Sequence, residues 1–138
     1  MATAVRLGDG DACIAEARHV AVDFLGRLRA EHHVSVSARA MELTQLVVSE
    51  LVTNARKYAP GPLWMELAVA DGAVEVEVTV RDSARERPAA RSVDPGRVGQ
   101  HGLEIVMAVT RGFRVLLEPS GKRVTARIAL SDGPANAR

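Results

Sequence analysis

Apolar residues in the first part of the chain recur with helical spacing. From Asp11, a suitable N-cap, to about Arg29 they return every three or four positions, which predicts an amphipathic helix. A second helix is predicted from about Ser37 to Ala59, with Ser35 or Ser37 as its cap. It is expected to end there, because Pro60-Gly61-Pro62 cannot continue a helix and favours a rigid turn.

Two later pairs of segments alternate between apolar and polar positions, which is the spacing of strands. Residues 63–69 and 74–80 flank Asp71-Gly72, and residues 113–118 and 123–130 flank the turn Pro119-Ser120-Gly121-Lys122. Each pair predicts a β-hairpin with one aliphatic face. The residues expected to point inward are Leu63, Met65, Leu67, Val69, Val74, Val76, Val78, Val80, Val124, Ala126, Ile128 and Leu130. The face that meets water is expected to carry Glu66, Glu75, Glu77 and Thr79.

Between the hairpins, the chain from Ser83 to about Val98 shows no periodicity. A loop of about 16 residues is long for a compact domain and is typical of a lid or a disordered segment. Gly99-Gln100-His101-Gly102 then opens a short helix from Leu103 to about Arg111, with Gly112 as its C-terminal cap. The basic residues of the loop are Arg85, Arg87, Arg91 and Arg97. The short helix is expected to turn inward Ile105, Val106 and Val109.

The order of elements is helix, helix, hairpin, long loop, helix, hairpin. This order predicts an α+β fold, a two-layer α/β sandwich with helices on one face of a mostly antiparallel sheet. No internal repeat or linker divides residues 1–138, so we expect a single domain. Residues 1–10 are expected either to fray or to form a short edge strand, and residues 131–138 to form a tail.

Composition narrows the class of protein. Hydrophobic residues make up 47% and charged residues 25%, as in ordinary globular domains, and the 3% of aromatic residues predicts an aliphatic core. A net charge of +1 gives no overall attraction to nucleic acid or an anionic membrane. Without an apolar run of membrane-spanning length or a signal peptide, the expected location is the cytoplasm.

The cysteine and histidines favour structural or solvated roles. Cys13 is the only cysteine, so it cannot form an intramolecular disulfide and is expected to be a small buried apolar residue. His19, His32 and His33 fall on the first helix and its exit without an accompanying acidic or cysteine cluster. Solvent exposure is therefore favoured over metal ligation for these histidines.

Three polar residues line up near the end of the second predicted helix. Glu50, Asn54 and Lys57 lie four and three positions apart, which places them along one stripe of the helix. On spacing alone, such a stripe is most often a solvated face. A carboxylate, a carboxamide and an ammonium on one stripe could also hold a hydrated divalent cation and a polyphosphate.

Together with two later elements, the stripe resembles a known family. Asp82 ends a predicted strand, and Gly99 and Gly102 open a helix after the long loop. Their order is similar to that of the Bergerat-type ATP-binding fold of DNA gyrase and histidine kinases, the GHKL or histidine-kinase-like ATPase domain. Within it the chain most resembles serine-kinase anti-sigma factors and stand-alone ATP-binding regulatory proteins of actinomycetes. The most specific parts are Glu50-Leu-Val-Thr-Asn54-Ala and Gly121-Lys122-x-Val124.

The resemblance implies ATP and Mg²⁺ as cofactors and gives each helix residue a role. Asn54 matches the asparagine that binds Mg²⁺, an ion that requires oxygen ligands. Glu50 matches the catalytic carboxylate that orients or deprotonates the attacking hydroxyl or water. Lys57 matches a lysine that contacts phosphate.

The resemblance also assigns residues to the binding of adenine and to the lid over the nucleotide. Asp82 matches the aspartate that accepts a hydrogen bond from the adenine amino group, and Ser83 either assists it through a water or forms a turn. Gly99 and Gly102, followed by Leu103, match the glycine box that lets backbone N–H groups approach phosphates. His101 either adds a donor or packs in the lid.

The chain departs from the family pattern after Asp82. The family usually has Asp-x-Gly-x-Gly, whereas Ala84 and Glu86 stand at these glycine positions. The loop is therefore expected to lie farther from the base. The arginines of the loop either approach phosphates or are solvated.

Two functions are compatible with these residues. One is a kinase that binds Mg-ATP and phosphorylates a serine of an anti-sigma-antagonist-like protein. The other is a binding module that sequesters a sigma factor or another regulator, with nucleotide as a stabiliser or absent. Direct binding of nucleic acid is disfavoured, because acidic residues dilute the basic ones and aromatic residues are few. The resemblance also implies a homodimer.

Overall fold

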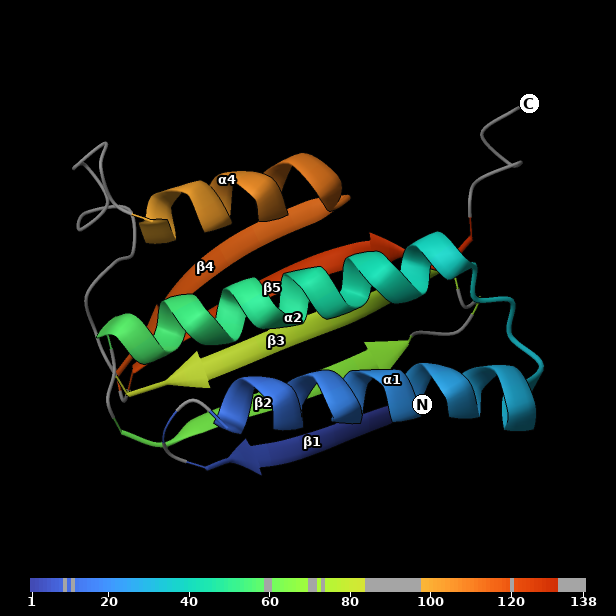
Figure 1. Cartoon of the computed structure of the whole chain (residues 1–138), viewed down its shortest axis with the longest axis horizontal. Coiled ribbons are helices and arrows are strands. Elements are labelled where there is room, and N and C mark those ends of the chain that lie inside the picture. Colours follow the sequence, from blue (N-terminus) through green and yellow to red (C-terminus); the bar gives the residue numbers. More distant parts are fainter. Residues whose placement is uncertain are drawn as a thin grey trace.

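A five-stranded antiparallel sheet with helices on one face forms a two-layer α/β sandwich (Figure 1), which confirms the predicted fold class. The computed structural model describes residues 1–8, 10, 12–58, 61–69, 72, 74–83, 98–119 and 121–131. The strand order is β1-β2-β3-β5-β4. The elements are β1 (Ala2–Leu7), α1 (Ala12–His32), α2 (Ala38–Tyr58), β2 (Leu63–Val69), β3 (Glu75–Asp82), α4 (Val98–Val109), β4 (Gly112–Glu118) and β5 (Gly121–Ala129).

The connection from α1 to α2 is fixed by local hydrogen bonds. α1 ends where His33 adopts a left-handed backbone with φ of 56°. The guanidinium of Arg29 then donates to the carbonyl of Val36 at 3.0 and 2.6 Å. Ser37 caps α2 as predicted, because its hydroxyl oxygen accepts the N–H of Ala40 at 2.9 Å. The N-cap proposed for α1, Asp11, lies outside the described residues.

The N-terminal segment is an edge strand, one of the two alternatives for residues 1–10. β1 pairs antiparallel with β2, in a register that runs from Ala2 opposite Ala68 to Leu7 opposite Leu63. Leu7 is 2% exposed and belongs to the core. The segment is therefore fastened to the sheet by backbone hydrogen bonds and by one buried side chain.

The core fills the space between the aliphatic face of the sheet and the helices. Every hairpin residue expected to point inward is buried except Val74, which is 67% exposed and precedes the first residue of β3. The buried stripe of α2 consists of Val47, Val48, Leu51, Val52 and Ala55. Burial of such side chains contributes about 25 cal/mol for each Å² removed from water, so this layer supplies most of the stabilisation.

The opposite face of the sheet contains one unexpected buried pair. Thr79 was expected to meet water but is 6% exposed, and its hydroxyl lies 3.1 Å from that of Thr125 on β5. Glu66 and Arg114 flank the two threonines in the same row across the strands. The short hydroxyl side chains are therefore enclosed between longer neighbours and satisfy each other.

The short helix differs from its prediction at both ends. α4 begins at Val98, so Gly99 and Gly102 lie inside it, and Ile105 is 43% exposed whereas Val106 is buried. Periodicity alone did not determine which of these two adjacent residues faces α2. Gly112 starts β4 and has no left-handed backbone, so it is not the cap. A Cβ there would lie 2.5 Å from Nε of Arg127, a flexible side chain that can move aside.

Gly121 permits a closer backbone contact. A Cβ at this position would lie 2.8 Å from the carbonyl carbon of Asp82 and 2.9 Å from Cα of Ser83. We expect Gly121→Ala to lower the free energy of unfolding by about 2–4 kcal/mol, because backbone atoms cannot move aside cheaply. The measurement is urea denaturation followed by circular dichroism.

Gly26→Ala is the matched control for this substitution. A Cβ at Gly26, inside α1, would meet nothing within 4 Å. Since alanine favours a helix over glycine by about 1 kcal/mol, the control variant should be more stable than the wild type. Equal stability of the two variants would contradict the close contact at Gly121.

Candidate functional site

The three residues of the predicted stripe, in the C-terminal half of α2, differ in their exposure to solvent. Glu50 is half-buried, Asn54 is 5% exposed and Lys57 is exposed. α2 packs against the sheet on one side and against α4 on another. The carboxylate and the carboxamide therefore lie at the margin of the core, and the ammonium lies in solvent at the end of the helix.

Asn54 has the features of a residue that can accept a ligand. None of the hydrogen bonds found among the described residues involves its carboxamide, although buried amides are almost always bonded. Asn54 as a whole is 5% exposed, so only a small part of the residue is open to solvent. A neutral oxygen in this setting fits a hydrated Mg²⁺ that keeps most of its waters or phosphate ligands.

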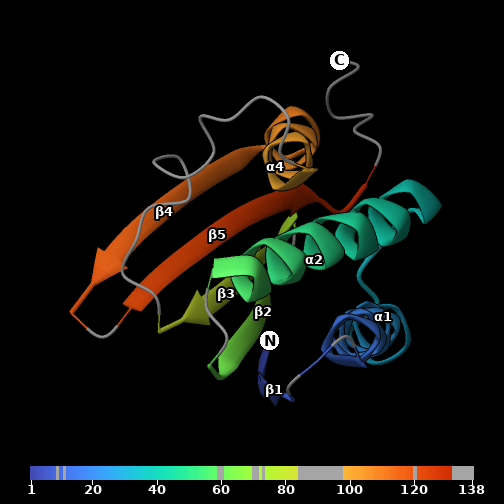
Figure 2. The same cartoon turned by 60° about the vertical axis from the view of Figure 1, so that its left-hand side comes forward.

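Several element ends meet at the same end of the sandwich as Asn54. Figure 1 shows there the C-terminal end of α2, the arrowhead of β3, the start of α4 and the β4–β5 turn, and Figure 2 shows this end brought forward. Ser83, which is exposed, follows β3 directly, and a Cβ on Gly61 would lie 3.1 Å from its hydroxyl. The chain after α2 therefore touches the chain after β3.

Asp82 is not open to solvent at this end. Its side chain is 1% exposed, that of Lys122 is 0% exposed, and Oδ2 of Asp82 lies 3.5 Å from Nζ of Lys122. The two residues face each other in the register between β3 and β5. An ammonium thus lies beside the carboxylate that the sequence assigned to adenine.

The electrostatic role of Lys122 was missing from the sequence interpretation, although the sequence holds a signal for it. Lys122 has the same strand parity as Val124, Ala126, Ile128 and Leu130, all of which point inward. A lysine at the head of an inward-facing aliphatic series predicts a buried cation. Such a cation requires an anion nearby, and the strand that pairs with β5 ends in Asp82.

Arg56 is a second residue that the sequence interpretation did not assign. Its guanidinium donates to the carbonyl of Gly61 at 2.7 Å and to the carbonyl of Gly8 at 2.8 Å. It therefore ties the last turn of α2 to the start of β2 and to the link between β1 and α1. Arginine in the last turn of a helix before a proline-rich turn is the available signal, since such side chains commonly satisfy nearby carbonyls.

The glycine box is placed only in part. Gly99, His101, Gly102 and Leu103 belong to the first turns of α4. Only the first N–H groups of a helix lack intrahelical partners, so Gly99 lies among them, whereas the N–H groups of Gly102 and Leu103 bond within the helix. The side chains of His101 and Leu103 lie outside the described part of the structure, as do residues 84–97 with the altered Ala84 and Glu86.

Metal ligation by clustered side chains finds no support in the described residues. No group of three His, Cys, Asp or Glu residues occurs among them, and His19, His32 and His33 are exposed. Cys13 is buried as predicted. No helix of the described part of the chain combines the length and apolar character needed to cross a membrane.

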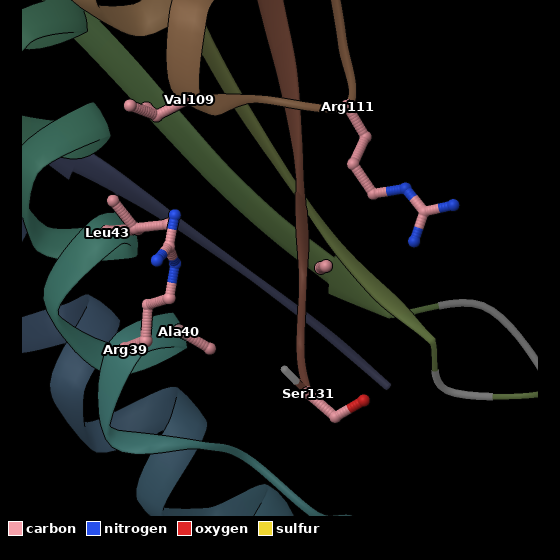
Figure 3. Close-up of a pocket in the computed structure, with 7 residues that line it drawn as sticks. Arg39, Ala40, Leu43, Val109, Arg111 and Ser131 are labelled. Carbon is pink, nitrogen blue, oxygen red and sulfur yellow. The ribbon is translucent and has the colours of Figure 1, made fainter. Parts of the chain in front are cut away.

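A separate cavity lies at the other end of α2. Figure 3 shows this space of about 480 Å³, with Arg39 and Leu43 on one side and Val109 above. Its lining consists of Arg39, Ala40, Leu43, Val109, Arg111, Ala129 and Ser131. None of the predicted site residues contributes to it, so it is distinct from the Asn54 end of the molecule.

Comparison with known proteins shows a shared fold with histidine kinase domains. A blue-light activated histidine kinase of Erythrobacter litoralis EL346 matches with a TM-score of 0.59 and 21% identity, over 90% of this chain and 42% of that chain. The histidine kinase domain from that protein matches with a TM-score of 0.53 and 21% identity, over 86% of this chain and 60% of the other. The chain thus spans less than two thirds of either structure. No family model and no curated protein matches it.

Substitution of Lys122 tests how much the Asp82–Lys122 pair contributes to the stability of the fold. Lys122→Met should lower the free energy of unfolding by about 3–5 kcal/mol, because it leaves a buried carboxylate without its ammonium. The double variant Asp82→Asn with Lys122→Met should recover part of this loss, since it removes both charges. Urea denaturation of the wild type, both single variants and the double variant measures the coupling; additive losses would contradict a direct interaction.

Proposed function

We propose that the chain is an ATP-binding regulatory protein of the anti-sigma factor and serine-protein kinase type. It binds Mg-ATP and phosphorylates a serine of a small antagonist protein. The observation that carries this proposal is Asn54, a buried carboxamide on the central helix, in a fold shared with histidine kinase domains. Glu50, one turn earlier on the same helix, supports it.

The roles in this proposal follow from chemistry and position. Mg²⁺ supplies charge neutralisation for the transferred phosphoryl group. Asn54 provides a protein oxygen for the ion, and Glu50 accepts the proton of the attacking serine hydroxyl. Lys57 is exposed at the end of α2, where its ammonium can reach phosphate oxygens. The backbone N–H groups at the start of α4 add further donors for phosphate.

A second function is favoured by the state of Asp82. Its carboxylate is buried and lies 3.5 Å from the ammonium of Lys122, so a base has no open acceptor there. In this alternative the chain is a regulatory module that sequesters a sigma factor or another protein, and nucleotide has little effect. In either function we propose a protein partner in the cytoplasm and a homodimer, without direct contact to nucleic acid.

Calorimetric titration with ATP, with and without Mg²⁺, separates the two functions. The kinase proposal expects binding that strengthens with Mg²⁺, and Asn54→Ala should remove this dependence because the metal loses its protein oxygen. Thr53→Ala, at the exposed neighbouring position, is the control and should keep the dependence. An absence of binding at millimolar ATP would favour the regulatory module.

Substitution of Glu50 tests the chemical step. Glu50→Ala should slow release or transfer of the γ-phosphate by about 10²-fold or more, while ATP affinity stays within a few fold, since a general base acts in the transition state. Labelled ATP gives the rate, and calorimetry gives the affinity. Glu42→Ala, an exposed carboxylate of the same helix, should change neither quantity. Equal loss of rate and affinity in the Glu50 variant would contradict the assigned role.

A further inference from the structure

The ammonium of Lys122 lies beside the carboxylate of Asp82 inside the protein. Both side chains are enclosed, at 0% and 1% exposure, with 3.5 Å between Nζ and Oδ2. The pairing of the strands sets this contact, because Asp82 and Lys122 are directly opposite each other in the β3–β5 register. Gly121 brings the two strands still closer, since no Cβ would fit against the backbone of Asp82 and Ser83.

We infer that Lys122 is a specificity-determining residue that competes with the nucleotide base for Asp82. This inference rests on the proposed function and describes the regulation of the same site. An exocyclic amino group of a base is a neutral donor, whereas Lys122 offers a full positive charge to the same carboxylate. A base therefore gains a hydrogen bond to Asp82 only when it displaces a stronger partner.

The consequence is a site whose affinity comes from the phosphates. Asn54 and Lys57 lie on α2, and the other phosphate donors lie at the start of α4, so none of these groups belongs to the β3–β5 contact. Mg-ATP and magnesium tripolyphosphate, which lacks base and ribose, should therefore bind the wild type with similar affinity. The affinities for ATP and GTP should also differ little. The carboxylate of Asp82, which would accept a hydrogen bond from the adenine amino group, interacts with Lys122 instead.

Removing the ammonium should expose the selectivity of Asp82. In Lys122→Met, the amino group of adenine becomes the available donor for a buried carboxylate, so ATP affinity should rise by about tenfold or more. GTP, with a carbonyl oxygen at the corresponding position, should gain much less. Affinity for tripolyphosphate should stay within about twofold of the wild type, because the phosphate end is unchanged.

Calorimetry with the three probes on wild type, Lys122→Met, Lys122→Gln and Arg123→Met makes the test. Lys122→Gln removes the charge but keeps a donor, and it serves where Lys122→Met does not fold. Arg123→Met removes the next cation of β5, which pairs with Glu118 at 3.2 Å on the other face of the sheet, and should leave all three affinities unchanged.

The outcomes separate this inference from the proposed function. A wild type that prefers ATP to tripolyphosphate by about tenfold, or a folded Lys122 variant that binds ATP no more tightly, would overturn competition by Lys122. Absence of binding of both ATP and tripolyphosphate to every variant would overturn the proposed function, and the inference with it. A tenfold gain restricted to ATP in the Lys122 variants supports both.

Discussion

The structure depends on a single constraint, the burial of one aliphatic face of the sheet beneath α2. Val47, Val48, Leu51, Val52 and Ala55 all lie within 4% exposure, and together they fix the rotation of the helix about its axis. Once that rotation is fixed, the next stripe around the helix must fall at the margin of the core. Asn54 is therefore buried by the packing of its neighbours, and its chemistry follows from the geometry of the core.

The regular elements were predictable because hydrophobic spacing is a local property. Both hairpins and both long helices follow from the periods of apolar residues, and the cap at Ser37 follows from its hydroxyl. The predictions were wrong at positions where the local pattern is compatible with more than one placement of a side chain or strand end. Alternation extends to Val74, but the strand begins one residue later, and helical spacing does not decide between Ile105 and Val106.

The relative placement of the candidate residues was predictable on the helix and less so on the strands. Glu50 and Asn54 lie on one continuous helix, so their relation follows from sequence separation alone. The neighbour of Asp82, in contrast, is 40 positions away and is fixed by strand register, which the motif itself does not encode. The sequence analysis assigned Lys122 to the turn, whereas it belongs to β5, and its anion could be identified only after β3 and β5 were paired.

The buried pair also limits how the site can vary. A carboxylate held inside the protein by an ammonium favours one register between β3 and β5, and loss of either partner alone leaves a charge that the interior solvates poorly. Asp82 cannot be open to a ligand and bound to Lys122 at the same time. In a chain that keeps the aspartate but has an uncharged residue after Gly121, the carboxylate lacks the ammonium and needs other polar partners in its place. Under the proposed nucleotide function, the residue after Gly121 is therefore the position expected to decide whether Asp82 binds an ammonium of the protein or a base.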